Sequence, residues 1–148
     1  MDTLLAILHH FAAFGIVAAQ AIEVTMLRGA LDAARLERLA KVDRLYLVAL
    51  ALAAGAGAAR VVLGPKGAAF YVGNPVFWLK VAAFAAIVAF ALAPARRFVA
   101  WRDASRRDAA FEPGADDAAA MRRHVFRAAH VVLVVLVAAP LMARGLGL

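Results

Sequence analysis

The chain contains no cysteine, which excludes disulfides, thiolate metal sites and thiol chemistry. Acidic residues are also scarce, because Asp and Glu total 10 against 17 Lys and Arg. Neither a His-x-x-x-His nor a Glu-x-x-His motif occurs, and Ser, His and Asp are not spaced as a hydrolytic set. These absences argue against metal-dependent or nucleophilic hydrolysis.

The surplus of positive charge does not indicate a nucleic-acid-binding protein. The basic residues are segregated between apolar runs, which is the distribution of membrane topology signals. Anionic lipid headgroups are sufficient partners for such basic segments. The predicted partner is therefore the lipid bilayer, with no nucleic acid.

The sequence instead contains long apolar runs. It is 66% hydrophobic, with a mean hydropathy of +0.80, well above the share in soluble domains. Four apolar runs cover residues 4–26, 45–63, 76–94 and 125–143, each near the ~20 residues that cross a bilayer. They lack the alternation of barrel strands, and the N-terminus lacks the basic start of a cleavable signal. The prediction is an all-α integral membrane four-helix bundle, a single transmembrane domain over residues 1–148.

Basic residues predict the orientation of this bundle. Residues 27–44 carry five Lys and Arg and residues 95–124 carry seven, whereas Lys66 is the only one in residues 64–75. The positive-inside rule makes the two basic loops cytoplasmic and both termini periplasmic, in a bacterial inner membrane. Residues 28–44 are expected to form a short surface helix and residues 64–75 a turn region.

Aromatic residues flank the third span. Trp78 is expected at the outer membrane interface, and Phe98 and Trp101 at the inner one. The helix of this span is expected to continue past Trp101 to about Ala110.

Polar residues inside the first two spans follow helical spacing. His9, Gln20 and Glu23 share one stripe, while His10 points about 100° away from it. Glu23 is expected either to face the bundle interior or to pair with a basic residue at the membrane edge or on the fourth span. These basic candidates are Arg28, Arg44 and Arg127. On the second span Tyr46 and Arg60 share a face with Ala49, Ala53 and Gly57, whose small size allows a close helix approach.

Four groups that are cationic or can become so fall on one side of the membrane: His9, His10, Arg60 and Lys80. No acid is apparent near them in the outer loops, so an anion on a ligand, such as a propionate, is expected to balance them. The alternative is that Arg60 and Lys80 reach to outer headgroups.

These residues predict candidate sites. His9 or His10 is the candidate haem ligand, with His10 the tentative iron ligand and Arg60, Lys80 and Trp78 beside the cofactor. His10 and His130 are expected about 12 Å apart along the membrane normal, too far to share one iron. The candidates for a proton or polar relay are Glu23, Asp43, Tyr46 and His130.

Several segments carry a family resemblance. These segments are Asp43-Arg44-Leu45-Tyr46, Gly57 to Arg60, Lys66-Gly67, Asn74-Pro75-Val76-Phe77-Trp78-Leu79-Lys80, Pro94 to Phe98 and Trp101-Arg102. Over nearly the whole chain they resemble a family of small bacterial four-span membrane proteins. More distantly, the layout is similar to CopD-like and HemJ-like membrane proteins.

HemJ-type proteins are haem-b-dependent protoporphyrinogen oxidases, and this resemblance implies functional roles for His10 (or His9) and Lys80. The CopD-like similarity points to copper, for which this chain lacks cysteine ligands.

The leading functional hypothesis is a haem-b-binding redox membrane protein, and whether it is an enzyme stays open. Two alternatives remain: a non-enzymatic assembly or structural component, such as a homo-oligomer, and a transporter of a small ion or anion. The sequence does not specify a redox partner.

Overall fold

The computed structural model describes residues 2–144 and, apart from those at 142 and 143, their side chains. Met1 and residues 145–148 of the predicted domain lie outside the described residues. The elements in chain order are α1 (Asp2–Met26), α2 (Ala33–Leu63), α3 (Gly67–Val72), α4 (Pro75–Arg107) and α5 (Ala115–Ala143). All but α3 contain segments long and apolar enough to cross a membrane. The predicted all-α four-helix membrane architecture is confirmed.

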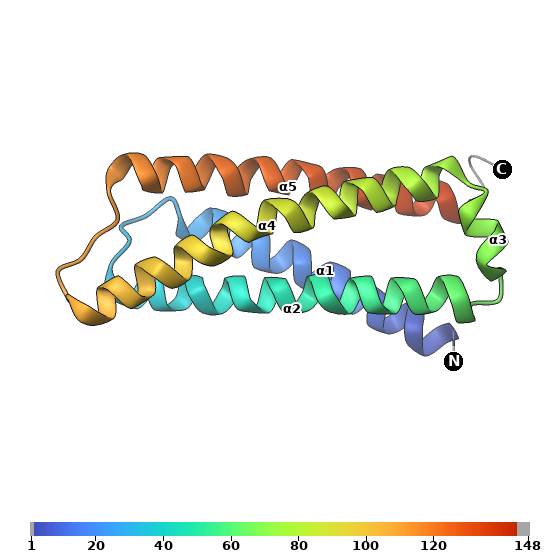
Figure 1. The fold of residues 1–148 in the computed structure, drawn as a ribbon, viewed down its shortest axis with the longest axis horizontal. Coiled ribbons are helices and arrows are strands. Elements are labelled where there is room, and N and C mark those ends of the chain that lie inside the picture. Colours follow the sequence, from blue (N-terminus) through green and yellow to red (C-terminus); the bar gives the residue numbers. More distant parts are fainter. Residues whose placement is uncertain (1, 145–148) are drawn as a thin grey trace.

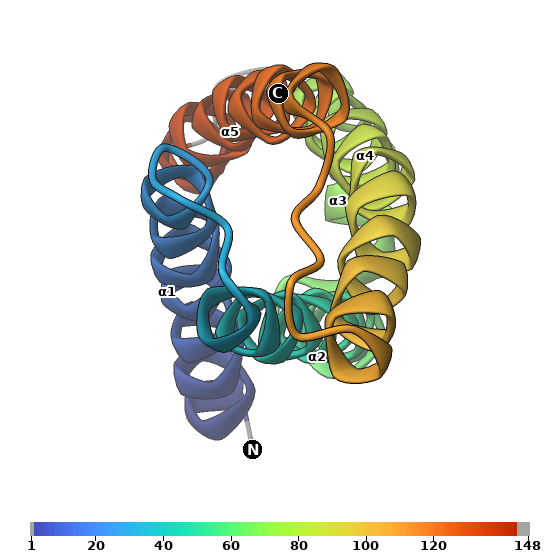
Figure 2. The ribbon, with the colours of Figure 1, turned by 90° about the vertical axis from the view of Figure 1, so that its left-hand side faces the viewer.

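The four long helices form a ring in the order α1, α2, α4, α5, seen end-on in Figure 2. The most extensive packing is between α1 and α2, followed by α4 with α5. Within the described residues the backbones of the diagonal pairs, α1 with α4 and α2 with α5, do not approach closely. Side chains that face inward from α1 therefore meet mainly α2.

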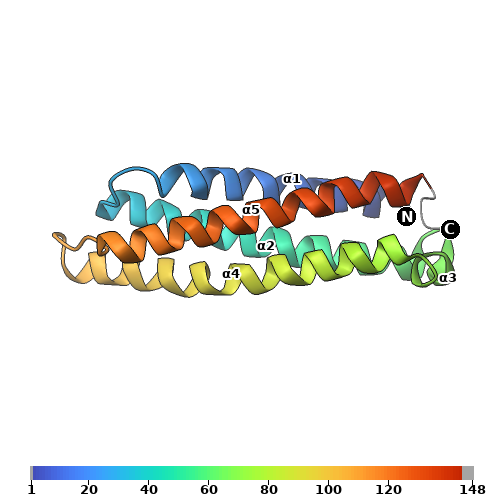
Figure 3. The ribbon, with the colours of Figure 1, turned by 90° about the horizontal axis from the view of Figure 1, so that it is seen from above.

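The two ends of the bundle differ. The start of α1, the short α3 and the end of α5 lie together at one end, called here the α3 end (Figures 1 and 3). The α1–α2 and α4–α5 links lie at the opposite end, called here the loop end (Figure 1). The apolar runs explain this arrangement, because four spans joined by short connections alternate in direction.

The segment predicted as a surface helix is instead the beginning of α2. Asp32 caps this helix, its carboxylate accepting a hydrogen bond from the Arg35 backbone N–H at 2.8 Å. Beyond the cap, Leu36 and Leu39 are fully buried at 0% exposure. The prediction was wrong because this leucine face packs against protein at the loop end and not against a lipid surface.

The prediction for Phe98 and Trp101 was also wrong. They are 0% and 4% exposed, and they pack with Leu27, Leu36 and Val125 in a core at the loop end. Their helix α4 ends at Arg107, close to the expected Ala110. The two rings were expected among lipid headgroups. They fill a protein core instead, because α2 and α5 also extend beyond the apolar runs.

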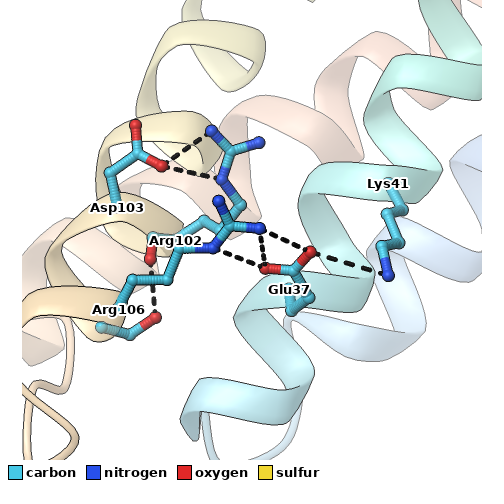
Figure 4. Close-up of polar contacts among 6 residues, drawn as sticks. Glu37, Lys41, Arg102, Asp103 and Arg106 are labelled. Carbon is cyan, nitrogen blue, oxygen red and sulfur yellow. Dashed lines mark hydrogen bonds and ion pairs between the residues drawn. The ribbon is translucent and has the colours of Figure 1, made fainter.

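Ion pairs join the extended parts of the helices, as Figure 4 shows for α2 and α4. Arg106 on α4 lies 3.0 Å from Glu37 on α2, which also pairs with Lys41 at 3.6 Å. Asp117 on α5 accepts a hydrogen bond from the Trp101 indole at 3.2 Å. Exposed pairs of this kind each contribute at most about 1 kcal/mol, so they position the helix ends while the apolar core stabilises them.

At the α3 end, the expected turn contains the short helix α3. Gly67 begins it with a φ of +71°, a conformation that glycine adopts readily. Asn74 then caps α4 by accepting from the Val76 backbone N–H at 2.8 Å, with Pro75 in the first helical position. The Asn-Pro pair thus fixes where α4 begins, five residues before Lys80.

Candidate functional site

Two groups of polar side chains lie between the long helices. The first, near the α3 end, consists of Asp2, His9, Arg60 and Lys80, and is called here the cationic cluster. The second, nearer the loop end, consists of Gln20, Glu23, Asp43 and Tyr46, and is called here the acid cluster. Both groups contain sequence-predicted residues drawn from separate helices.

His9 is held against the backbone of α2. Its Nδ1 lies 3.0 Å from the carbonyl oxygen of Ala53, and the ring is half-buried. A Cβ added at Gly57 would lie 3.3 Å from His9 Cε1, so the absent side chain leaves room for the imidazole. The predicted role of Ala53 and Gly57 in a close approach of helices is confirmed.

Arg60 and Lys80 bring positive charge to the same place from α2 and α4. Both lie close enough to His9 to interact with it electrostatically, and Lys80 interacts likewise with Arg60. The structure therefore brings together three of the four residues that the sequence placed on one side of the membrane.

Asp2 is the member of this cluster that the sequence reading missed. Its Oδ1 lies 3.5 Å from Arg60 Nε, although no acid was expected near the cationic residues. The expectation was wrong because Asp2 belongs to the first turn of α1 and not to an outer loop. Helical spacing could have predicted this pair. His9 lies beside Ala53, Asp2 is two turns before His9, and Arg60 is two turns after Ala53 on the antiparallel helix.

His10 points away from the cationic cluster. It is exposed on the outer side of α1, and its Nδ1 lies 2.6 Å from the Ala6 carbonyl oxygen of the same helix. His9 contacts α2 whereas His10 is exposed and contacts only its own helix, which confirms that the two residues face different directions. Of the two histidines, only His9 faces Arg60 and Lys80.

Two further predicted residues lie apart from both clusters. His130 is exposed on α5, with Nδ1 2.8 Å from the Phe126 carbonyl oxygen. Trp78 is 53% exposed, and its indole donates to the Val72 carbonyl oxygen at 2.9 Å. Neither side chain points into the bundle.

The acid cluster is almost completely buried. Gln20, Glu23, Asp43 and Tyr46 are 4%, 1%, 3% and 3% exposed. Gln20 donates from Nε2 to the Tyr46 hydroxyl at 3.4 Å, and the carboxyls of Glu23 and Asp43 lie close enough to interact electrostatically. Glu23 Oε1 and Asp43 Oδ1 are buried without a hydrogen-bond partner among residues 2–144.

Of the two alternatives for Glu23, the structure shows the inward-facing one. Its three suggested basic partners, Arg28, Arg44 and Arg127, are exposed, and no ion pair to Glu23 occurs in the described part of the chain. That part also holds no group of three or more His, Asp or Glu arranged to bind a metal ion.

Comparison with other proteins identifies a family for this chain but no individual relative. No curated protein and no solved structure matches it significantly. Residues 1–147 match the family described as "Predicted membrane protein (DUF2214)". A match of that extent, together with four helices able to cross a membrane, shows that this chain is an integral membrane protein belonging to the DUF2214 family.

Proposed function

We propose that this membrane protein binds haem b through His9 and acts in a redox reaction. The observation that carries the proposal is the contact between His9 Nδ1 and the Ala53 carbonyl oxygen. A carbonyl can only accept, so Nδ1 carries the proton and Nε2 of the neutral ring keeps a free lone pair. Metal-binding histidines are commonly oriented by such a bond to a backbone carbonyl.

The charges around His9 fit the acidic groups of haem b. Arg60 is shared with Asp2, whereas Lys80 has no ion-pair partner among the described residues. A half-buried ammonium inside a bilayer favours an anionic partner. Arg60 and Lys80 are therefore proposed to hold the propionates, next to the small residues Ala53 and Gly57.

In this proposal His9 is the one histidine that would hold the iron. His124 lies between α4 and α5, with Nε2 2.8 Å from the Phe90 carbonyl oxygen, and His10 and His130 are exposed. When bound, haem b would supply a one-electron redox centre. The residues of the chain would bind it, orient it and balance its charge.

The orientation of the protein is part of the same proposal. With residues 27–44 and 95–124 in the cytoplasm of a bacterial cell, the cationic cluster lies in the periplasmic half of the inner membrane. The acid cluster then lies in the cytoplasmic half. The distribution of Lys and Arg supports this placement.

Visible absorption spectra of the purified protein test the haem proposal. Protein expressed with added haem is expected to show a Soret band and to change on reduction with dithionite. His9→Ala should abolish the band, and His10→Ala is the matched control that should retain it. A colourless wild type, or a band that depends on His10 and not on His9, contradicts the proposal.

Lys80 also favours a second candidate, the binding or transport of a small anion other than haem. Its ammonium group would serve any carboxylate or phosphate equally. Flux of a labelled anion into liposomes that is lost in Lys80→Ala but persists in a haem-free preparation would favour this function. Flux that is absent, or unaffected by Lys80→Ala, argues against it.

A further inference from the structure

We propose that Glu23 and Asp43 form a proton-binding site in the interior of the bundle, which holds at least one proton at neutral pH. One carboxyl comes from α1 and the other from α2, the two helices that pack most extensively. The site does not require haem, so this proposal can be tested independently of the function proposed for His9.

Burial without partners is the first argument. Glu23 and Asp43 are 1% and 3% exposed, and each has a buried carboxyl oxygen that meets no donor among residues 2–144. An ionised carboxylate loses its hydration when it is buried, and it needs donors or a counter-charge in return. A protonated carboxyl is neutral and avoids this requirement.

The second argument is that no cation forms an ion pair with either carboxyl in the described part of the chain. Arg35 and Arg122 reach the end of α1, but they donate to the backbone carbonyl oxygens of Met26 and Leu27. Arg28 and Arg44, which flank these residues in sequence, and Arg127 on α5 all have exposed side chains. Among the described residues α4 and α5 contribute no buried charged group, and their core residues beside Tyr46 are apolar: Ile87, Ala91 and Val132.

The two carboxyls also act on each other. They lie close enough for electrostatic interaction, so ionising both would place like charges together inside the protein. One bound proton removes that repulsion, and a second leaves the pair neutral. This mutual effect distinguishes the pair from a single buried acid.

Tyr46 is the remaining titratable group that faces the site. Its hydroxyl oxygen accepts from Gln20, which leaves its own O–H free to donate. Tyr46 lies within electrostatic reach of both carboxyls. Tyr46 is thus a neutral neighbour that supplies no counter-charge to the two carboxyls.

An apolar layer separates the site from the loop end. Glu23 is one helical turn from the end of α1, and the next turn begins with Leu27, which is 2% exposed. Leu31 and Leu36 pack with Leu27 in the same core. A proton that leaves toward this end must pass between these side chains, which keep the pair out of direct contact with bulk water.

Infrared spectroscopy of the full-length protein in a detergent without ester groups tests the proposal. At pH 7 the wild type should show the C=O stretch of a protonated carboxylic acid, shifted in D2O. Glu23→Gln and Asp43→Asn should each weaken or remove it, because amides copy the shape of a neutral acid without its proton. Glu112→Gln, at an exposed acid in the α4–α5 link, is the matched control and should leave it unchanged.

Two results would overturn the proposal. The first is a wild-type spectrum without a protonated carboxyl at pH 7, which needs no variant to fold. The second is thermal stability that rises with sodium chloride but not with choline chloride in the wild type, and with neither salt in Glu23→Gln. That result would assign the carboxyls to a cation in place of a proton.

Discussion

Nδ1 of His9 lies 3.0 Å from the carbonyl oxygen of Ala53, which makes a backbone atom of α2 the partner of a side chain on α1. The contact is possible because the neighbouring position on the same face, Gly57, has no side chain. The position of the imidazole therefore depends directly on the spacing between α1 and α2. Changes at Gly57 should alter both helix packing and the chemistry of His9.

Replacing Gly57 with leucine is expected to destabilise the protein. The first added carbon already falls 3.3 Å from His9 Cε1, and the remaining carbons must displace the ring or separate α1 from α2. Overpacking of this kind costs about 1–3 kcal/mol, which thermal unfolding in detergent would detect. Gly55→Leu is the control, because a Cβ there meets no described atom within 4 Å. Equal losses of stability at both positions would show that the approach of Gly57 to His9 is not the cause.

Lys80→Ala is expected to weaken haem binding without removing the axial ligand. A charge-assisted hydrogen bond contributes about 1.5–3 kcal/mol, so the dissociation constant should rise by at least about tenfold. Titration of haem into the haem-free protein, followed at the Soret band, measures this change.

Lys66→Ala provides the comparison for Lys80. The Lys66 ammonium lies 4.3 Å from the centre of the Phe70 ring, and it is not among the charged groups that act on His9. Its removal should therefore leave haem affinity unaltered. Similar losses for both lysines would indicate a general effect of positive charge and not a specific partner at Lys80.

Phe98→Ala should destabilise the loop end far more than loss of the ion pair between Arg106 and Glu37. The Phe98 ring is fully buried, and such truncations cost about 3–5 kcal/mol. Arg106→Gln removes an exposed pair worth at most about 1 kcal/mol. Chemical denaturation monitored by circular dichroism would compare the two variants, and a larger loss for Arg106→Gln would show that the pair, and not the core, holds α4.

Single cysteines test the orientation, because the natural chain has none. With both termini outside, Lys66→Cys should react with a membrane-impermeant thiol reagent in intact cells. Ala109→Cys, exposed in the α4–α5 link, should react only after the cells are permeabilised. Val88→Cys, within α4, should resist the reagent in both conditions. The reverse pattern for positions 66 and 109 would invert the proposed topology.

Local patterns in the sequence were sufficient for the spans and for the faces of single helices. Apolar length without strand-like alternation placed the four spans, since a helix of that length satisfies its own backbone hydrogen bonds in a bilayer. Helical periodicity placed Gln20 and Glu23 on one stripe, set His10 apart from His9, and identified Ala53 and Gly57 as a surface for close packing. Each of these depends only on residues within one helix.

The tertiary structure decided which faces meet and at what height. Asp2 reaches Arg60 only because α1 and α2 pack in one particular register, and Glu23 lies within electrostatic reach of Asp43 for the same reason. The leucines after Asp32 became core because α2, α4 and α5 all extend past their apolar runs. Periodicity fixes directions around a helix axis, but contacts between helices depend on their relative shift and crossing, which the sequence of one helix does not contain.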